Sequence, residues 1–468
     1  MRRKRKISGR KISGRRNQQG VIITLVAVFM LIVIGAMAAL SIDVVTLYTA
    51  RSEAQLAADG AALAGARVLA NSGMTSDPTG GLIGGAETLA SAVALQVGQQ
   101  SQVGGRNLVA ANGEVVVVGF SGTPTNPCPA PNPAQTNPCI TVHVQRTDMP
   151  TFFARIWGTM KVTVTASATA EAYNPSGANL LSGTTTPIAP MCVKPWLLPN
   201  MDPRDPSGAT AIFDKTTGAI IAPAALLGWE SPGPPPAPDP ATRLSVACPG
   251  GDCSTGLPPP VRWKYYPGDP GPASFPPPTV ALPTCSQVPT PTPYQSSVAG
   301  CIQTPIACNS TVSIDISQYF ARDSETVYAV NCLTHSAPPP GGNGGDKVDP
   351  IYVPPASPFE FLGGANNPIP GLDGNDVMVS DSLVTVPVFN STNGVAPPNP
   401  VAIIGFLQLF MNPEGNEAPP LPPPTGPAWG GTLKTTVINM AGCGTNAAGN
   451  PILGNGPSPV AVRLISPP

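Results

Sequence analysis

The chain has 468 residues, a formal net charge of −1 and only 11% charged residues, while its 49 Gly and 62 Pro fill about a quarter of all positions. So many prolines limit the share of regular helix and central strand, which argues against one large α/β enzyme core. With aromatic residues at 5%, the composition indicates modest hydrophobic cores joined by extended connectors.

The N-terminal segment is strongly basic and precedes a long apolar run. Nine of the first 16 residues are Lys or Arg, and none is acidic. From Val21 to Ile42 all but two residues are apolar or Gly, and a helix of this length spans about 33 Å, enough to cross a bilayer. A basic flank beside such a span is a topology signal, so we expect a lipid bilayer as partner and no nucleic acid. The positive-inside rule places residues 1–20 in the cytoplasm and everything after Asp43 across the membrane.

Two kinds of processing would remove part of this segment. Ala36-Met37-Ala38 offers the A-x-A pattern of a signal-peptidase site, but the apolar run exceeds the roughly 7–15 residues of a secretory signal. A prepilin-type leader would instead be cut after Gly20. We expect an uncut, single-pass anchor, because the run continues without a Pro or loop signal into more helix.

Residues 43–70 contain no Pro and consist mainly of strong helix formers, so the apolar helix is expected to continue beyond the membrane. Small and apolar residues recur along it at spacings of three and four. These residues are Leu47, Ala50, Ala54, Ala57, Ala61, Ala64 and Val68. We call them the Ala seam. A seam of small side chains predicts a closely packed partner, either a sheet of the same chain or a second copy of the helix in a homo-oligomer.

Five residues follow the apolar span at characteristic places: Asp43, Tyr48, Arg51, Gln55 and Asp59. Together with the basic stretch, Gly20 and the Ala-rich tail, this order resembles the N-terminal domain of TadG-like proteins of the Flp (tight adherence) pilus system. The stretch from Val142 to Ala172 resembles the region that closes the part shared by TadG-like and TadE-like proteins. The resemblance implies a membrane-anchored accessory of pilus assembly, with other pilus-assembly proteins as partners.

Two departures from the family pattern limit what is carried over. The fifth residue after Gly20 is Leu25, where related pseudopilins have a glutamate, which argues against cleavage by a prepilin peptidase. Longer TadG-like proteins have a D-x-S-x-S metal loop, and the nearest match, at Asp315, lacks the second serine. We therefore predict no metal site and no cofactor.

The segment 43–175 is predicted to form a small α+β domain outside the membrane. A second helix is expected from Ala86 to Gln100, followed by three strands. The predicted strands are Val115–Phe120, Ile140–Val144 and Val162–Ala168. An aromatic cluster between the last two (Phe152, Phe153, Ile156 and Trp157) follows Pro150, where a short helix could begin.

Beyond residue 175 the chain is rich in proline, so it is expected to contain strands, turns and extended linkers. Residues 176–370 are interpreted as a Pro/Gly-rich, Cys-containing region and residues 371–468 as a β-rich C-terminal unit. Four strands are assigned to that unit, within Val377–Phe389, Val401–Met411, Leu433–Met440 and Val460–Ile465.

All ten cysteines follow the apolar span, which fits disulfides in an oxidising compartment. Zinc is the alternative, but there is no C-x2-C pair and the chain has only two histidines. The candidate local pairs are Cys128 with Cys139, Cys248 with Cys253, and Cys301 with Cys308.

The fold class predicted is therefore α+β. A transmembrane helix continues into a long Ala-rich helix packed on a small antiparallel sheet, and a Pro-rich, disulfide-bonded, β-rich region follows. No serine-hydrolase elbow, phosphate loop or dinucleotide fingerprint is present in the sequence, and a non-catalytic protein of the cytoplasmic membrane is expected. The alternative is a cell-surface adhesin that presents its C-terminal unit on a Pro-rich stalk; a periplasmic enzyme is a third hypothesis.

Overall fold

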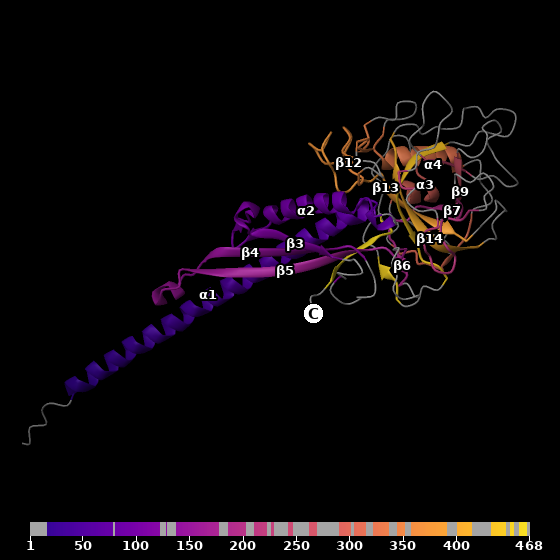
Figure 1. Ribbon diagram of the computed structural model, residues 1–468. Coiled ribbons are helices and arrows are strands. Elements are labelled where there is room, and N and C mark those ends of the chain that lie inside the picture. The colour runs from indigo at the N-terminus through magenta and orange to yellow at the C-terminus, as the bar shows by residue number, and fades with distance from the viewer. Residues whose placement is uncertain are drawn as a thin grey trace, which may run out of the picture.

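The computed structural model describes eighteen stretches of the chain. They are residues 16–77, 80–121, 128, 137–176, 186–202, 210–221, 226–228, 242–246, 262–268, 290–300, 304–314, 322–336, 344–351, 357–390, 400–413, 432–445, 450–453 and 458–465. Figure 1 shows one long helix that projects from a body built around two sheets.

The long helix is α1 (Arg16–Asn71), with 56 residues. At about 1.5 Å per residue it is about 84 Å long. Its sequence contains no Pro and is dominated by Ala, Leu, Ile and Val, so nothing in it interrupts the helix. The prediction of one helix that continues beyond the apolar span is confirmed.

A four-stranded antiparallel sheet lies against the C-terminal half of α1, in the order β17-β5-β4-β3. Its strands are β3 (Val115–Ser121), β4 (Cys139–Pro150), β5 (Lys161–Tyr173) and β17 (Ala461–Ile465). The helix α2 (Ile83–Gln100) runs beside α1, as Figure 1 shows. Alternate residues of β4 and β5 form one core with the small residues of both helices, as expected for a sheet with one face covered by helices.

A second, larger sheet forms the head of the molecule, in the order β10-β14-β13-β7-β9-β8-β15. Its strands are β7 (Trp196–Pro199), β8 (Thr242–Val246), β9 (Arg262–Pro267), β10 (Thr311–Val312), β13 (Leu383–Phe389), β14 (Val401–Met411) and β15 (Thr432–Gly442). Because β14 also pairs with β15, the sheet closes on itself. Every residue of β13 is buried, so both of its faces are covered.

Short elements complete the described parts of the chain. The helices are α3 (Pro293–Ala299) and α4 (Arg322–Leu333), with the 3-10 helices η1 (Met74–Ser76), η2 (Ala110–Asn112) and η3 (Ala154–Trp157). Three two-stranded pairs are β1 (Gln102–Val103) with β2 (Arg106–Asn107), β11 (Lys347–Val348) with β12 (Phe361–Leu362), and β6 (Ile188–Ala189) with β16 (Ile452–Leu453).

The structure corrects one expectation about the C-terminal strands. Of the four strands assigned to one C-terminal unit, β13, β14 and β15 do pair side by side. The fourth, β17, instead pairs with β5, with Arg463 opposite Glu171. The chain therefore returns from the head to the first sheet, which no local sequence pattern could indicate. The boundary proposed at residue 371 itself stays a prediction.

Candidate membrane anchor and its attachment to the two sheets

The first part of α1 has the properties of a membrane span. Every described side chain from Gly20 to Gly35 is exposed, although most are large and apolar. An 18-residue window of this helix has a mean hydropathy of 3.0, and none of it is buried within the chain. By length and composition this is the one helix in the described residues that could cross a membrane.

Asp43, the first charged residue after the span, is only 4% exposed and binds the β4–β5 loop. Its carboxylate oxygens accept hydrogen bonds from the backbone N–H groups of Phe152 (2.9 Å), Phe153 (3.0 Å) and Ala154 (2.8 Å). These hydrogen bonds lower the pKa of Asp43 below its usual value, and the one from Phe152 has the largest effect. Burial of the carboxylate acts in the opposite direction. The ionised carboxylate thus fixes the start of η3 against the helix.

Two further residues of the predicted motif attach α1 to β5. The side-chain amide of Gln55 donates to the carbonyl oxygen of Ser167 (3.2 Å) and to a carboxylate oxygen of Asp59 (2.7 Å). Asp59 thereby orients Gln55 toward the strand. Of the five motif residues the structure thus joins Gln55 to Asp59, while Asp43 binds the β4–β5 loop and Tyr48 and Arg51 are exposed on the helix.

The Ala seam packs within the chain. Ala50, Ala54, Ala57 and Ala61 are each at most 3% exposed and share a core with α2 and the first sheet. Of the two partners weighed for the seam, the sheet of the same chain is correct. The structure gives no support for a homo-oligomer through the seam, because the seam residues share a core with the sheet and with α2.

The C-terminal end of α1 is joined to the head by buried hydrogen bonds. Asn439 of β15 donates from its side-chain amide to the carbonyl oxygen of Ala70 (2.5 Å) and to the side-chain oxygen of Gln408 in β14 (2.6 Å). Gln408 in turn donates to the side chain of Asn71 (3.2 Å). The side-chain oxygen of Asn439 accepts from the hydroxyls of Thr75 (3.3 Å) and Ser76 (3.2 Å). We call these residues the junction network.

The junction network was missed by sequence reasoning. Asn439 and Gln408 are fully buried polar residues, and Gln408 lies in the otherwise apolar strand β14, whereas β15 contains Lys and Thr residues as well. The irregularity in β14 is the only sequence signal they give. Their partners at the end of α1 lie more than 300 residues away in the chain, so that pairing could not be inferred.

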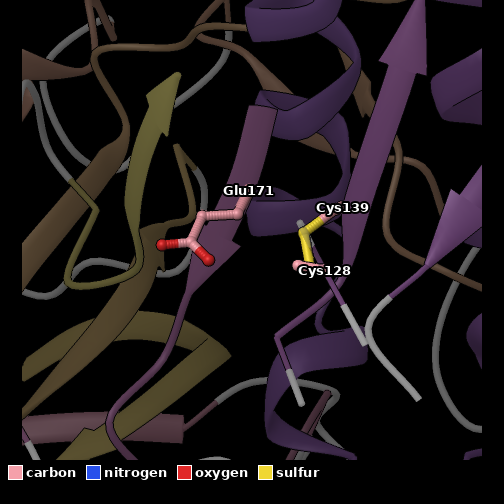
Figure 2. Close-up of side chains that lie close together, drawn as sticks. All are labelled: Cys128, Cys139 and Glu171. Carbon is pink, nitrogen blue, oxygen red and sulfur yellow. A yellow bond between two sulfur atoms is a disulfide. The ribbon is translucent and has the colours of Figure 1, made fainter. Parts of the chain in front are cut away.

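Cys128, Cys139 and Glu171 lie close together, as Figure 2 shows, with Cys139 at the start of β4 and Glu171 near the end of β5. The two cysteines form a disulfide, as predicted, so their sulfur atoms are not thiolate ligands for a metal. Cys139 and Glu171 are opposite each other in β4 and β5. Glu171 forms an ion pair with Arg463 of β17, and burial raises its pKa while Arg463 opposes that effect. The ion pair thus joins the C-terminal strand β17 to β5.

A second disulfide corrects the predicted pairing of Cys301 with Cys308. Cys308 is bonded to Cys443, which is 135 residues away in sequence. The reason lies in the strand order, because the backbone next to each cysteine is bonded to neighbouring residues of β14. Asn309 donates to Ile403 and Cys443 donates to Ile404. Cys192 and Cys332 are disulfide-bonded as well. The described residues do not include Cys248, Cys253 or Cys301. They also do not include Asp315, where the sequence departs from the metal-loop pattern.

The head also contains a buried lysine that sequence analysis did not single out. Lys194 is 3% exposed, and its ammonium group donates to the carbonyl oxygen of Gly300 (2.8 Å). Burial lowers its pKa to about 7, while the nearby Asp381 opposes the shift. Asp381 also contacts the ring of His335 (3.0 Å), which raises the pKa of the histidine.

These features define a class of protein. A helix able to span a membrane continues unbroken into an α+β domain, and its end forms a buried junction with a closed β-sheet head. Residues 20–68 match the model of the family described as putative Flp pilus-assembly TadE/G-like. The match covers the span, Asp43, Gln55 and the Ala seam, and it confirms the resemblance over these residues. No curated protein matches the chain, and no solved structure matches it.

Proposed function

We propose that this protein is a membrane-anchored component of Flp-type pilus assembly, with a structural rather than a catalytic role. The observation that carries the proposal is the continuity of α1. The same helix contains the apolar span, the segment that matches the pilus-assembly family, and the contacts that hold both sheets. The other pilus-assembly proteins are its proposed partners.

The long helix sets the distance between the membrane and the head. From Asp43 to Asn71 the helix rises by about 42 Å. The head is bonded directly to the end of α1 through Asn439. The helix, rather than a proline-rich stalk, therefore supports the head, which favours an assembly or anchoring role over the adhesin alternative.

For topology we propose that residues 1–20 lie in the cytoplasm and that the rest, after the span, lies on the other side of the cytoplasmic membrane. The basic flank favours this orientation. Disulfides such as Cys128–Cys139 and Cys308–Cys443 fit an oxidising compartment. An alkaline phosphatase fused to the C-terminus should therefore be active, and a green fluorescent protein fused there should not fluoresce. The opposite pair of results would contradict the orientation.

The functional test is complementation of a deletion strain, with surface pili counted by electron microscopy. The deletion should abolish pili and the wild-type gene should restore them. A Phe29→Lys/Ile32→Lys variant should fail to restore them, because each lysine inside a bilayer costs about 2.5–3.5 kcal/mol. The matched control is Val116→Lys/Val118→Lys, which places the same charges on exposed apolar positions of β3.

The outcomes separate the candidate functions. Loss of pili with the span variant and their recovery with the β3 control support a membrane-anchored assembly role. Normal pilus numbers in the deletion strain would refute it. If pili remain but attachment to surfaces falls, the adhesin alternative is the better account.

A further inference from the structure

The β4–β5 loop, residues 151–160, is held at the level where the apolar span ends. Asp43 directly follows Ile42, the last residue of the span, and binds three successive backbone N–H groups of the loop. Ala39, one turn before Asp43, is only 5% exposed, whereas the earlier part of the span is exposed. The chain therefore covers α1 within the last turns of the apolar segment itself.

Figure 1 shows that this loop is the part of the two-sheet body that reaches furthest toward the N-terminal end of α1. The geometry of a bilayer then fixes its environment. If the span is centred in a hydrocarbon core of about 30 Å, the core ends about ten residues from the centre, near Ile42. The headgroup layer adds about 5–8 Å on each side, which corresponds to about four or five further helical residues. The loop bound to Asp43 falls within that layer.

The surface at this level is apolar and aromatic. Phe152 is 61% exposed and Met160 is 65% exposed in the loop, and on the helix Tyr48 is 74% and Val45 62% exposed. Large exposed apolar side chains grouped at one level are costly in water, and aromatic residues are enriched where bilayer and water meet. Arg155 and Lys161 in or beside the same loop are also exposed, and their charges suit anionic headgroups.

We propose that the β4–β5 loop is a second membrane-binding element, which inserts Phe152 and Met160 into the headgroup layer beside the end of the span. The proposal rests on the proposed membrane anchoring of Val21–Ile42. A single helix can tilt and rotate in a bilayer. A helix and a loop that bind the same leaflet side by side fix the orientation of the first sheet and of the head above it. Asp43 can lie at this depth because three backbone N–H groups of the loop donate to its carboxylate and stabilise its negative charge.

The test is photo-crosslinking of the full chain in nanodiscs of phosphatidylethanolamine and phosphatidylglycerol. p-Benzoylphenylalanine replaces one residue at a time, and lipid adducts on the corresponding peptide are measured by mass spectrometry. The test position is Phe152. Leu40, exposed within the span, is the positive control, and Val118, exposed on β3, is the negative control. Val118 lies beside the β4 segment around Thr141, which is about 30 Å along the strand from Pro150.

We expect lipid adducts at positions 152 and 40 in comparable yield, and at least tenfold less at position 118. Adducts at 40 without adducts at 152 would overturn the proposal and leave the anchor intact. A crosslink from 152 to a second copy of the chain would also overturn it, in favour of a protein contact. Absence of adducts at both 152 and 40 would refute the membrane anchor itself, so the two failures are distinguishable.

Discussion

Replacement of Asn439 by Ala should uncouple the long helix from the head. Asn439 is fully buried, and its side-chain amide donates to the carbonyl oxygen of Ala70 and to the side chain of Gln408. The carbonyl of Ala70 belongs to the last turn of α1, where no helical N–H is available to it. The substitution therefore removes the donor that Asn439 gives to two buried acceptors.

The size of the effect follows from these contacts. Each buried acceptor left without a donor costs about 1–3 kcal/mol, and the cavity left by the shorter side chain adds to this. For the two acceptors together, the central value is a loss of about 4 kcal/mol in the local stability of the junction. Because about 1.4 kcal/mol corresponds to a factor of ten, amide protection should fall roughly a thousandfold.

The assay is hydrogen exchange of the full chain in detergent, read by mass spectrometry on two peptides. One covers the end of α1, residues 63–71, and the other covers β15. The control is Asn375→Ala, which removes an exposed amide that donates to the carbonyl oxygen of Gly371 (3.0 Å) and should change protection by less than about threefold. Peptides of the first sheet, such as β4, should keep their protection in both variants.

Two results would refute the reasoning. If Asn439→Ala changes exchange at the end of α1 no more than Asn375→Ala does, the junction network does not hold the helix to the head. If protection falls equally in β4 and at the junction, the variant has unfolded as a whole, and the network is not a local coupling.

Three further predictions follow from packing, titration and disulfide bonding. Gly65→Leu should destabilise the protein by about 1–3 kcal/mol or more, because even a Cβ atom at this position would lie 2.5 Å from an isoleucine of β4. The control is Gly60→Leu. A Cβ atom there would have nothing within 4 Å, so this variant should be neutral or stabilising in thermal unfolding. Burial lowers the pKa of Lys194 from 10.5 to about 7, so above pH 7 the unfolded chain binds a proton that the folded chain does not, and stability should rise with pH by up to about 1.4 kcal/mol per unit. Lys194→Met should flatten this rise between pH 7 and 9, and equal slopes would contradict the assignment. Non-reducing peptide mapping should find Cys308 linked to Cys443. The Cys308→Ser/Cys443→Ser variant should lose up to about 5 kcal/mol of its free energy of unfolding, the chain-entropy value for a loop of 135 residues. A peptide linking Cys301 to Cys308 would show that the strand order near Cys308 is wrong.

Elements with a clear local pattern were predictable from the sequence. The apolar span and the Ala seam predicted α1, because the span is an unbroken apolar run and the seam consists of residues three or four positions apart. Strand β14 was predicted with the bounds it has, Val401–Met411, since its length and apolar content suffice to identify a buried strand. The disulfide of Cys128 with Cys139 was also predictable, because its partners are close in sequence and flank one loop.

Features that depend on distant pairing were not predictable. The place of β17 beside β5 and the closure of the head sheet through β14 and β15 arise from contacts between segments hundreds or tens of residues apart. The predicted pairing of Cys301 with Cys308 was wrong for the same reason, because the partner of Cys308 is set by the strand order and not by distance along the sequence. For the motif residues, the sequence indicated a family, but only the structure shows that Asp43 and Gln55 bind the β4–β5 hairpin.

The three points at which polar residues hold α1 determine how the anchor and the head move together. At about 100° per residue, Asp43 and Gln55 leave the helix in directions about 120° apart, and Gln55 and Asn71 in directions about 160° apart. The partners of these residues lie in the η3 loop, in β5 and in β14. Because the contacts approach from different sides, α1 cannot rotate about its axis without breaking at least one of them. Any reorientation of the helix must therefore be transmitted to the head, as the proposed role of a membrane anchor in pilus assembly requires.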